Sequence, residues 1–65
     1  MKQHGVAIER WDFQHRVNVV RWLKEHYGEA SNGQIRGRWR QEFDYGFEDL
    51  IMDEDVYVMY LLKWS

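Results

Sequence analysis

Cysteine and proline are both missing from this chain of 65 residues. The absence of cysteine excludes disulfide scaffolds, thiol nucleophiles and cysteine-ligated zinc, which often stabilise very small domains. No apolar run approaches the roughly 18 residues of a membrane span, and no amino-terminal segment resembles a secretory signal. We therefore expect one compact cytoplasmic domain over residues 1–65, with no membrane partner. Because so short a chain buries only about 60% of its unfolded surface, partners would add to its stability.

Aromatic residues are abundant by contrast, since four Trp, four Tyr and three Phe make up 17% of the chain. Each buried ring removes about 150 to 250 Å² from water, and a fold this small has one thin core to receive them. Several rings should therefore stay exposed. Exposed Trp and Tyr are the residue types that dominate binding hot spots, so the composition favours an interaction surface.

The formal charge of −2 is unevenly distributed along the chain. Residues 1–40 carry eight basic groups and four acidic ones, whereas residues 41–65 carry one basic group and seven acidic ones. Such asymmetry can steer a charged partner, or it can be neutralised inside the fold once the strands pair.

The first half of the chain predicts a strand and a helix. Successive side chains of residues 6–11 would fall on opposite faces of a strand, with Val6 and Ile8 on one face, and this pattern indicates a short strand. Residues 12–27 indicate a helix that begins at the N-cap Asp12 and ends at Gly28. Apolar residues at steps of three and four form its expected core face, namely Phe13, Val17, Val20, Leu23 and Tyr27. The neighbouring stripe is expected to be solvated and consists of His15, Val19, Trp22 and His26.

After the turn pair Asn32-Gly33, the period changes to two over residues 34–45, which predicts a half-buried strand. Trp39 should point into the core, while Arg38 and Arg40 face water or acidic neighbours. Tyr45-Gly46 predicts a turn, and residues 47–52 predict the returning arm of a hairpin.

The last segment fits two structures. Asp53, Glu54 and Asp55 suit a helix amino terminus, with Asp53 as the cap of a helix over residues 54–63. The alternating apolar residues from 56 to 64 also fit a fourth strand. We prefer the helix and predict an α+β fold, a small β-α-β-β domain with a largely antiparallel three-stranded sheet and a short C-terminal helix.

No catalytic constellation is present. The chain lacks a hydrolase elbow, a phosphate-binding glycine loop and a His-Glu-x-x-His motif. His15 and His26 are too far apart on the helix to share one metal ion, and the acids at 53–55 lack the other ligands of a calcium loop. A fold this small also offers little room for a ligand pocket of about 300 Å³. We expect no enzyme activity, no cofactor and no metal site.

Two binding functions remain open. The first is protein binding, with a homo-oligomer as one case, through anchors predicted at Tyr57, Tyr60, Trp64 and Trp22. The alternative is single-stranded nucleic-acid binding, because Arg36, Arg38 and Arg40 would lie about 6.6 Å apart along one strand face and could follow phosphates. An ion-pair ladder with the acidic second arm competes with that alternative.

The carboxyl-terminal half resembles small uncharacterised proteins of tailed bacteriophages. The segments that carry the resemblance are Arg38-Trp39, Phe47-Glu48-Asp49-Leu50, Asp53-Glu54-Asp55 and Tyr60-x-Leu62-Lys63-Trp64. Val56 and Tyr60 depart from the family pattern, which commonly has Ala and Phe there. The resemblance implies a phage-encoded protein that binds a host or phage protein complex as an inhibitor or adaptor in the host-cell cytoplasm.

Overall fold

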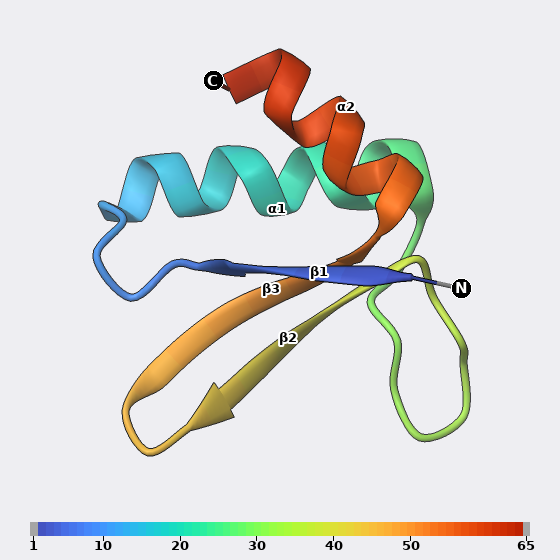
Figure 1. The fold of residues 1–65 in the computed structure, drawn as a ribbon, viewed down its shortest axis with the longest axis horizontal. Coiled ribbons are helices and arrows are strands. Elements are labelled where there is room, and N and C mark those ends of the chain that lie inside the picture. The colour runs from blue at the N-terminus through green and yellow to red at the C-terminus, as the bar shows by residue number, and fades with distance from the viewer. Residues whose placement is uncertain (1, 65) are drawn as a thin grey trace.

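A computed structural model describes residues 2–64 and confirms the α+β prediction. Five elements follow one another along the chain: β1 (Gln3–Ala7), α1 (Phe13–Tyr27), β2 (Trp39–Asp44), β3 (Phe47–Asp53) and α2 (Glu54–Trp64). Both helices lie on the same side of the sheet (Figure 1). The C-terminal segment is therefore a helix, and the alternative of a fourth strand is wrong.

The sheet has the strand order β1-β3-β2, with β3 antiparallel to both neighbours. β1 and β2 are consequently parallel, and α1 connects them across β3, which is a split β-α-β unit. His4 pairs with Met52 in the β1 ladder, and Trp39 pairs with the same Met52 in the β2 ladder. One register thus sets which side chains of all three strands face the helices.

The first strand begins and ends earlier than the predicted 6–11. Ile8 still lies on the predicted inner face and is buried, but its N–H donates to the Glu48 carbonyl oxygen just beyond the strand. The N–H of Trp11 then donates to the Ile8 carbonyl oxygen in a turn. This turn ends the strand and places Trp11 beside the helices.

The limits of α1 agree with the prediction. The Asp12 carboxylate accepts a hydrogen bond of 2.7 Å from the N–H of His15, and Gly28 ends the helix with a φ of 82°. The predicted core face is only partly right. Leu23 is buried, but Phe13 is 79% exposed, and the buried valine is Val19 from the stripe that was expected to be solvated. The helix is rotated because α2, whose position the sequence does not indicate, packs beside that second stripe.

The second strand is shorter than the predicted residues 34–45. Asn32 Oδ1 accepts from the N–H groups of Gln34 and Ile35, and these local bonds hold residues 32–35 in a turn. Trp39 is buried as predicted, and its indole N–H donates to the Gly28 carbonyl oxygen at 2.9 Å. At the far end of the hairpin, Phe43 and Tyr45 are exposed, because the hairpin projects beyond the helices (Figure 1).

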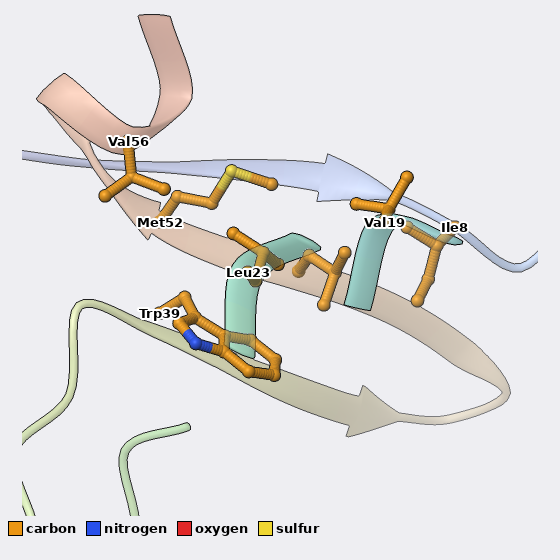
Figure 2. Packing of buried hydrophobic residues seen from close by; sticks show 7 residues of the cluster. Ile8, Val19, Leu23, Trp39, Met52 and Val56 are labelled. Atoms are coloured by element: carbon orange, nitrogen blue, oxygen red, sulfur yellow. The ribbon is translucent and has the colours of Figure 1, made fainter. Parts of the chain in front are cut away.

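The hairpin turn and the core complete the fold. Tyr45 and Gly46 both have positive φ, 48° and 85°, as the predicted tight turn requires. The core contains seven buried side chains from both helices and the strands and their flanks, shown in Figure 2: Ile8, Val19, Leu23, Trp39, Leu50, Met52 and Val56.

Candidate functional site

The predicted aromatic anchors form one continuous cluster inside the fold. We define the aromatic cluster as six half-buried residues that pack ring against ring: Trp11, Trp22, Tyr27, Tyr57, Tyr60 and Trp64. The Trp22 and Trp64 ring centroids are 5.0 Å apart, which joins α1 to α2. Trp11 and Tyr60 stack at 6.1 Å, which joins the turn after β1 to α2. These rings therefore hold α2 on the rest of the molecule, and only their remaining exposed parts can meet a partner.

Two histidines belong to the same contacts. His15, expected to be solvated, is half-buried, with its ring centroid 4.4 Å from that of Trp11 and 6.2 Å from that of Trp64. His4 stacks on Tyr57 at 4.5 Å. Partial burial raises the pKa of the Tyr60 hydroxyl, and the nearby Tyr57 adds to the shift. The groups are arranged for packing, and no three His, Asp or Glu side chains among residues 2–64 are placed to hold a metal ion.

The three arginines do not form one free stripe. Arg36 is exposed in the loop before β2 and makes no ion pair with residues 2–64. Arg38 donates to the carboxylates of Asp53, at 3.0 Å, and of Asp55. Arg40 donates to Glu42 at 2.8 Å and to the Gln3 side chain at 3.0 Å.

These contacts are part of a polar network across the open face of the sheet. Gln3 on β1 links Arg40 on β2 to Asp53 on β3, since its amide N–H donates to Asp53 at 3.4 Å. The carboxylate of Asp53 is therefore occupied by Arg38 and Gln3, a different use from the predicted helix cap. The hydrogen bond from Arg38 also lowers the pKa of the Asp55 carboxyl group.

A groove that the sequence did not predict lies along α1. It has a volume of about 540 Å³, which exceeds the roughly 300 Å³ that a ligand pocket needs and for which the short chain was expected to leave little room. We call it the α1 groove, and its walls are Arg16, Val17, Val20, Arg21, Lys24, Glu25 and Gln41. Six of these residues come from α1 and one from the edge strand β2.

The floor of the α1 groove is apolar, and its rim is net basic, because Arg21 and Lys24 outnumber the one carboxylate there, that of Glu25. Val17 and Val20 are half-exposed, because the rotated helix directs Val19 and Leu23 into the core instead. Phe13, one turn before Val17 on the same stripe, continues the apolar surface toward the start of α1. Arg21 and Lys24 are exposed on the rim and make no ion pair with residues 2–64. The stripe of Phe13, Val17 and Val20 is the signal in the sequence for this groove, although its apolar spacing predicts a core face.

A fixed polar wall closes the groove toward the sheet. Arg16 donates to the Glu48 carboxylate at 2.8 Å, and the Gln41 side chain donates to the same oxygen at 3.3 Å. Arg16 also donates to the Ile8 carbonyl oxygen at 3.2 Å. Arg16 is thus held by the fold, which leaves Arg21 and Lys24 as the cations that can meet a ligand.

Comparison with known proteins finds no family model, no curated protein and no solved structure that matches this chain. The resemblance to phage proteins stays a prediction. Among residues 2–64, neither helix is long and apolar enough to cross a membrane.

Proposed function

We propose that the protein is a non-enzymatic protein-binding module whose α1 groove accepts an acidic, amphipathic segment of another protein. The observation that carries the proposal is the groove floor of Val17 and Val20 beside Arg21 and Lys24, two cations that form no ion pair within residues 2–64. An apolar floor with a basic rim is complementary to a segment that presents apolar side chains between carboxylates.

The shape of the surface favours a polypeptide over a small molecule. The exposed stripe runs from Phe13 to Lys24, twelve residues of helix, or about 16 Å along the axis. Residues at spacings of three and four along this length match the apolar face of a bound helix of two to three turns. The hydrophobic residues would supply affinity, and Arg21 and Lys24 would select acidic partners and speed their encounter.

The arginine strand supports the alternative of nucleic-acid binding less well. Arg38 and Arg40 already bind carboxylates, so a phosphate would have to replace those contacts. The protein-binding proposal requires no such exchange at Arg21 and Lys24. Stoichiometric binding of this kind is how an inhibitor or adaptor acts, and that role is part of the proposal.

A designed peptide tests the groove. The probe is a fluorescent helical peptide with Leu at spacings of three and four and Glu at the flanking positions, and a control peptide carries Lys in place of Glu. We expect the Glu peptide to bind and to shift the amide resonances of Val17, Val20 and Lys24. Arg21→Glu with Lys24→Glu should weaken binding by about tenfold or more, which corresponds to about 1.4 kcal/mol.

The matched control is Arg36→Glu. It makes the same change from cation to anion as each groove substitution, but on a loop outside the groove. It should leave the affinity near that of the parent. Equal binding of the Glu and Lys peptides, or resonance shifts confined to other surfaces, would contradict the proposal.

A further inference from the structure

The outer edge of β1 lies on the other side of the sheet from the β2 edge that borders the α1 groove. The N–H of Ile8 donates to Glu48 O, and the N–H of Glu54 donates to Lys2 O. In an antiparallel ladder these inward bonds fall on alternate residues. The even-numbered residues of β1 therefore bind β3, while Gln3, Gly5 and Ala7 direct their N–H and C=O groups outward.

This edge lacks the usual protection against strand pairing. Charged side chains, proline, bulges or a covering loop normally block an exposed edge. The segment Gln3–Ala7 has no formally charged residue and no proline, and within residues 2–64 the only strand that pairs with β1 is β3. The opposite edge, on β2, is partly closed, because Trp39 O accepts a 2.7 Å hydrogen bond from the N–H of Ser31.

We propose that β1 pairs antiparallel with β1 of a second copy of this chain, so that two three-stranded sheets join into one. Centring the two-fold axis on Gly5 places Gly5 opposite its counterpart and Gln3 opposite Ala7 at both ends. All three outward residues then find a partner, and each facing pair exchanges two hydrogen bonds. Shifting the axis by one residue in either direction leaves an outward residue unpaired, so this register is the one the edge favours.

Small side chains keep the edge open for a neighbouring strand. Gly5 and Ala7 project from the open face of the sheet, and a Cβ atom at Gly5 would lie only 3.2 Å from Ile51 Cδ1. The Ile51 side chain thus occupies the space that a larger residue at position 5 would need. In this antiparallel register, Lys2 of one copy lies near the end of β1 that Glu9 follows in the other copy. The opposite charges of these two residues add complementarity.

The flank of α2 extends the same surface. Tyr57 stacks on His4 of β1, and Glu54 Oε2 lies 3.9 Å from His4 Nε2, so this side of α2 faces β1. Val58, one turn after Glu54, is 48% exposed, and Leu62, another turn on, is 74% exposed. Pairing of the two β1 strands would bring these apolar flanks toward each other, where their burial adds to the backbone hydrogen bonds.

Sedimentation equilibrium of the parent protein at about 10 to 500 µM tests the proposal first, because a strand-edge interface of this size is expected to be weak. We expect a dimer at the upper end of the range. Hydrogen exchange at the same concentrations should show the amides of Gly5 and Ala7 protected in the dimer and unprotected after dilution. A monomer throughout, or a dimer in which those two amides exchange as fast as in the monomer, would overturn the proposal.

Ala7→Pro supplies the matched substitution, since it removes an outward N–H that makes no bond to β3, and Pro is tolerated on edge strands. It should weaken dimerisation by about tenfold or more, while Ala7→Val, which keeps the N–H, should preserve it. A folded Ala7→Pro variant that dimerises like the parent would overturn the proposal. If that variant does not fold, hydrogen exchange at the Gly5 and Ala7 amides of the parent protein decides whether the β1 strands pair. None of these measurements involves the α1 groove.

Discussion

The Nε atom of Arg38 donates a 3.0 Å hydrogen bond to the carboxylate of Asp53, which is only 8% exposed. This pair joins the residue before β2 to the last residue of β3. Arg38 also donates to Asp55 at the start of α2, and its guanidinium carbon lies 5.9 Å from the Tyr27 ring centroid at the end of α1. One side chain therefore connects the ends of four elements.

Replacing Arg38 by Ala should lower the melting temperature more than replacing Arg36 by Ala. Asp53 would keep a nearly buried carboxylate without its cationic partner, and such a group is costly to leave unpaired. Arg36 has no ion pair with residues 2–64, so it is the matched control. Thermal melts monitored by circular dichroism compare the variants, and equal melting temperatures would show that the Arg38 contacts add nothing to the fold.

The Arg38–Asp55 contact predicts a pH dependence at acid pH. The hydrogen bond from Arg38 holds the pKa of Asp55 below its ordinary value of 3.8, so the folded protein keeps this carboxylate ionised at a pH where the unfolded chain has protonated it. The stabilisation is complete above the unfolded pKa and is lost as pH falls through the lower folded pKa. Because Asp55 is exposed, the stabilisation from this contact should also decrease with added salt.

Thermal melts of the parent and of Asp55→Asn, from neutral pH to below the folded pKa of Asp55, measure this loss of stabilisation. The melting temperatures should differ at neutral pH and converge once the pH falls below the folded pKa. Asp44→Asn is the control, because Asp44 is exposed and makes no ion pair with residues 2–64. A gap between parent and Asp55→Asn that stays constant at every pH would contradict the assignment.

The sequence predicts those features of the fold that interactions between nearby residues determine, and not those that depend on distant parts of the chain. Asp12 and Gly28 limit α1 through hydrogen bonds to nearby backbone, so the helix ends were predictable. The rotation of α1 was not, because valines occupy two adjacent stripes and only the position of α2 decides which is buried. The predicted core face includes Val17 and Val20, which in the structure are the floor of the α1 groove.

The loop before β2 shows the opposite case, in which local bonds override a regular pattern. Alternation over residues 34–45 favours a strand, but Ser31 and Asn32 bind backbone groups of the next few residues and hold them in turns. A Cβ at Gly37 would lie 2.5 Å from the Glu29 carbonyl oxygen, so the chain also packs tightly against itself there. An alternating apolar pattern does not reveal that side chains compete for the backbone hydrogen bonds of a strand in this way.

Trp39 should be among the residues whose loss costs the fold most. Trp39→Ala removes a buried ring and should lower the free energy of unfolding by about 3 to 5 kcal/mol, which is comparable with the total stability of a small domain. Trp39→Phe keeps most of the packing but leaves the Gly28 carbonyl without its 2.9 Å donor, and should cost less, about 1 to 3 kcal/mol. Urea unfolding measures both, and a Trp39→Ala protein as stable as the parent would refute the assigned strand face.

The aromatic cluster predicts coupled losses of stability and association. Tyr57→Ala, Tyr60→Ala and Trp64→Ala should each lower the melting temperature, because each ring packs on others that hold α2 in place. If the exposed parts of these rings also anchor a partner, association of the folded variants should weaken by about 2 kcal/mol or more. Tyr45, which is 96% exposed on the hairpin, is the control position. Three variants that melt and sediment like the parent would exclude both roles.

Salt dependence separates protein binding from nucleic-acid binding. If Arg36, Arg38 and Arg40 each neutralised a phosphate of a single strand, the logarithm of affinity would fall with the logarithm of salt concentration at a slope of about −0.7 per phosphate, or about −2 in total. We expect no such binding, because Arg38 and Arg40 are already paired with carboxylates whose negative charge also repels phosphate. Fluorescence anisotropy of a labelled oligonucleotide at low salt measures this directly. Binding with that slope, lost on combined replacement of the three arginines by Ala, would instead establish the nucleic-acid alternative, since only a phosphate that displaces Asp53, Asp55 and Glu42 could produce it.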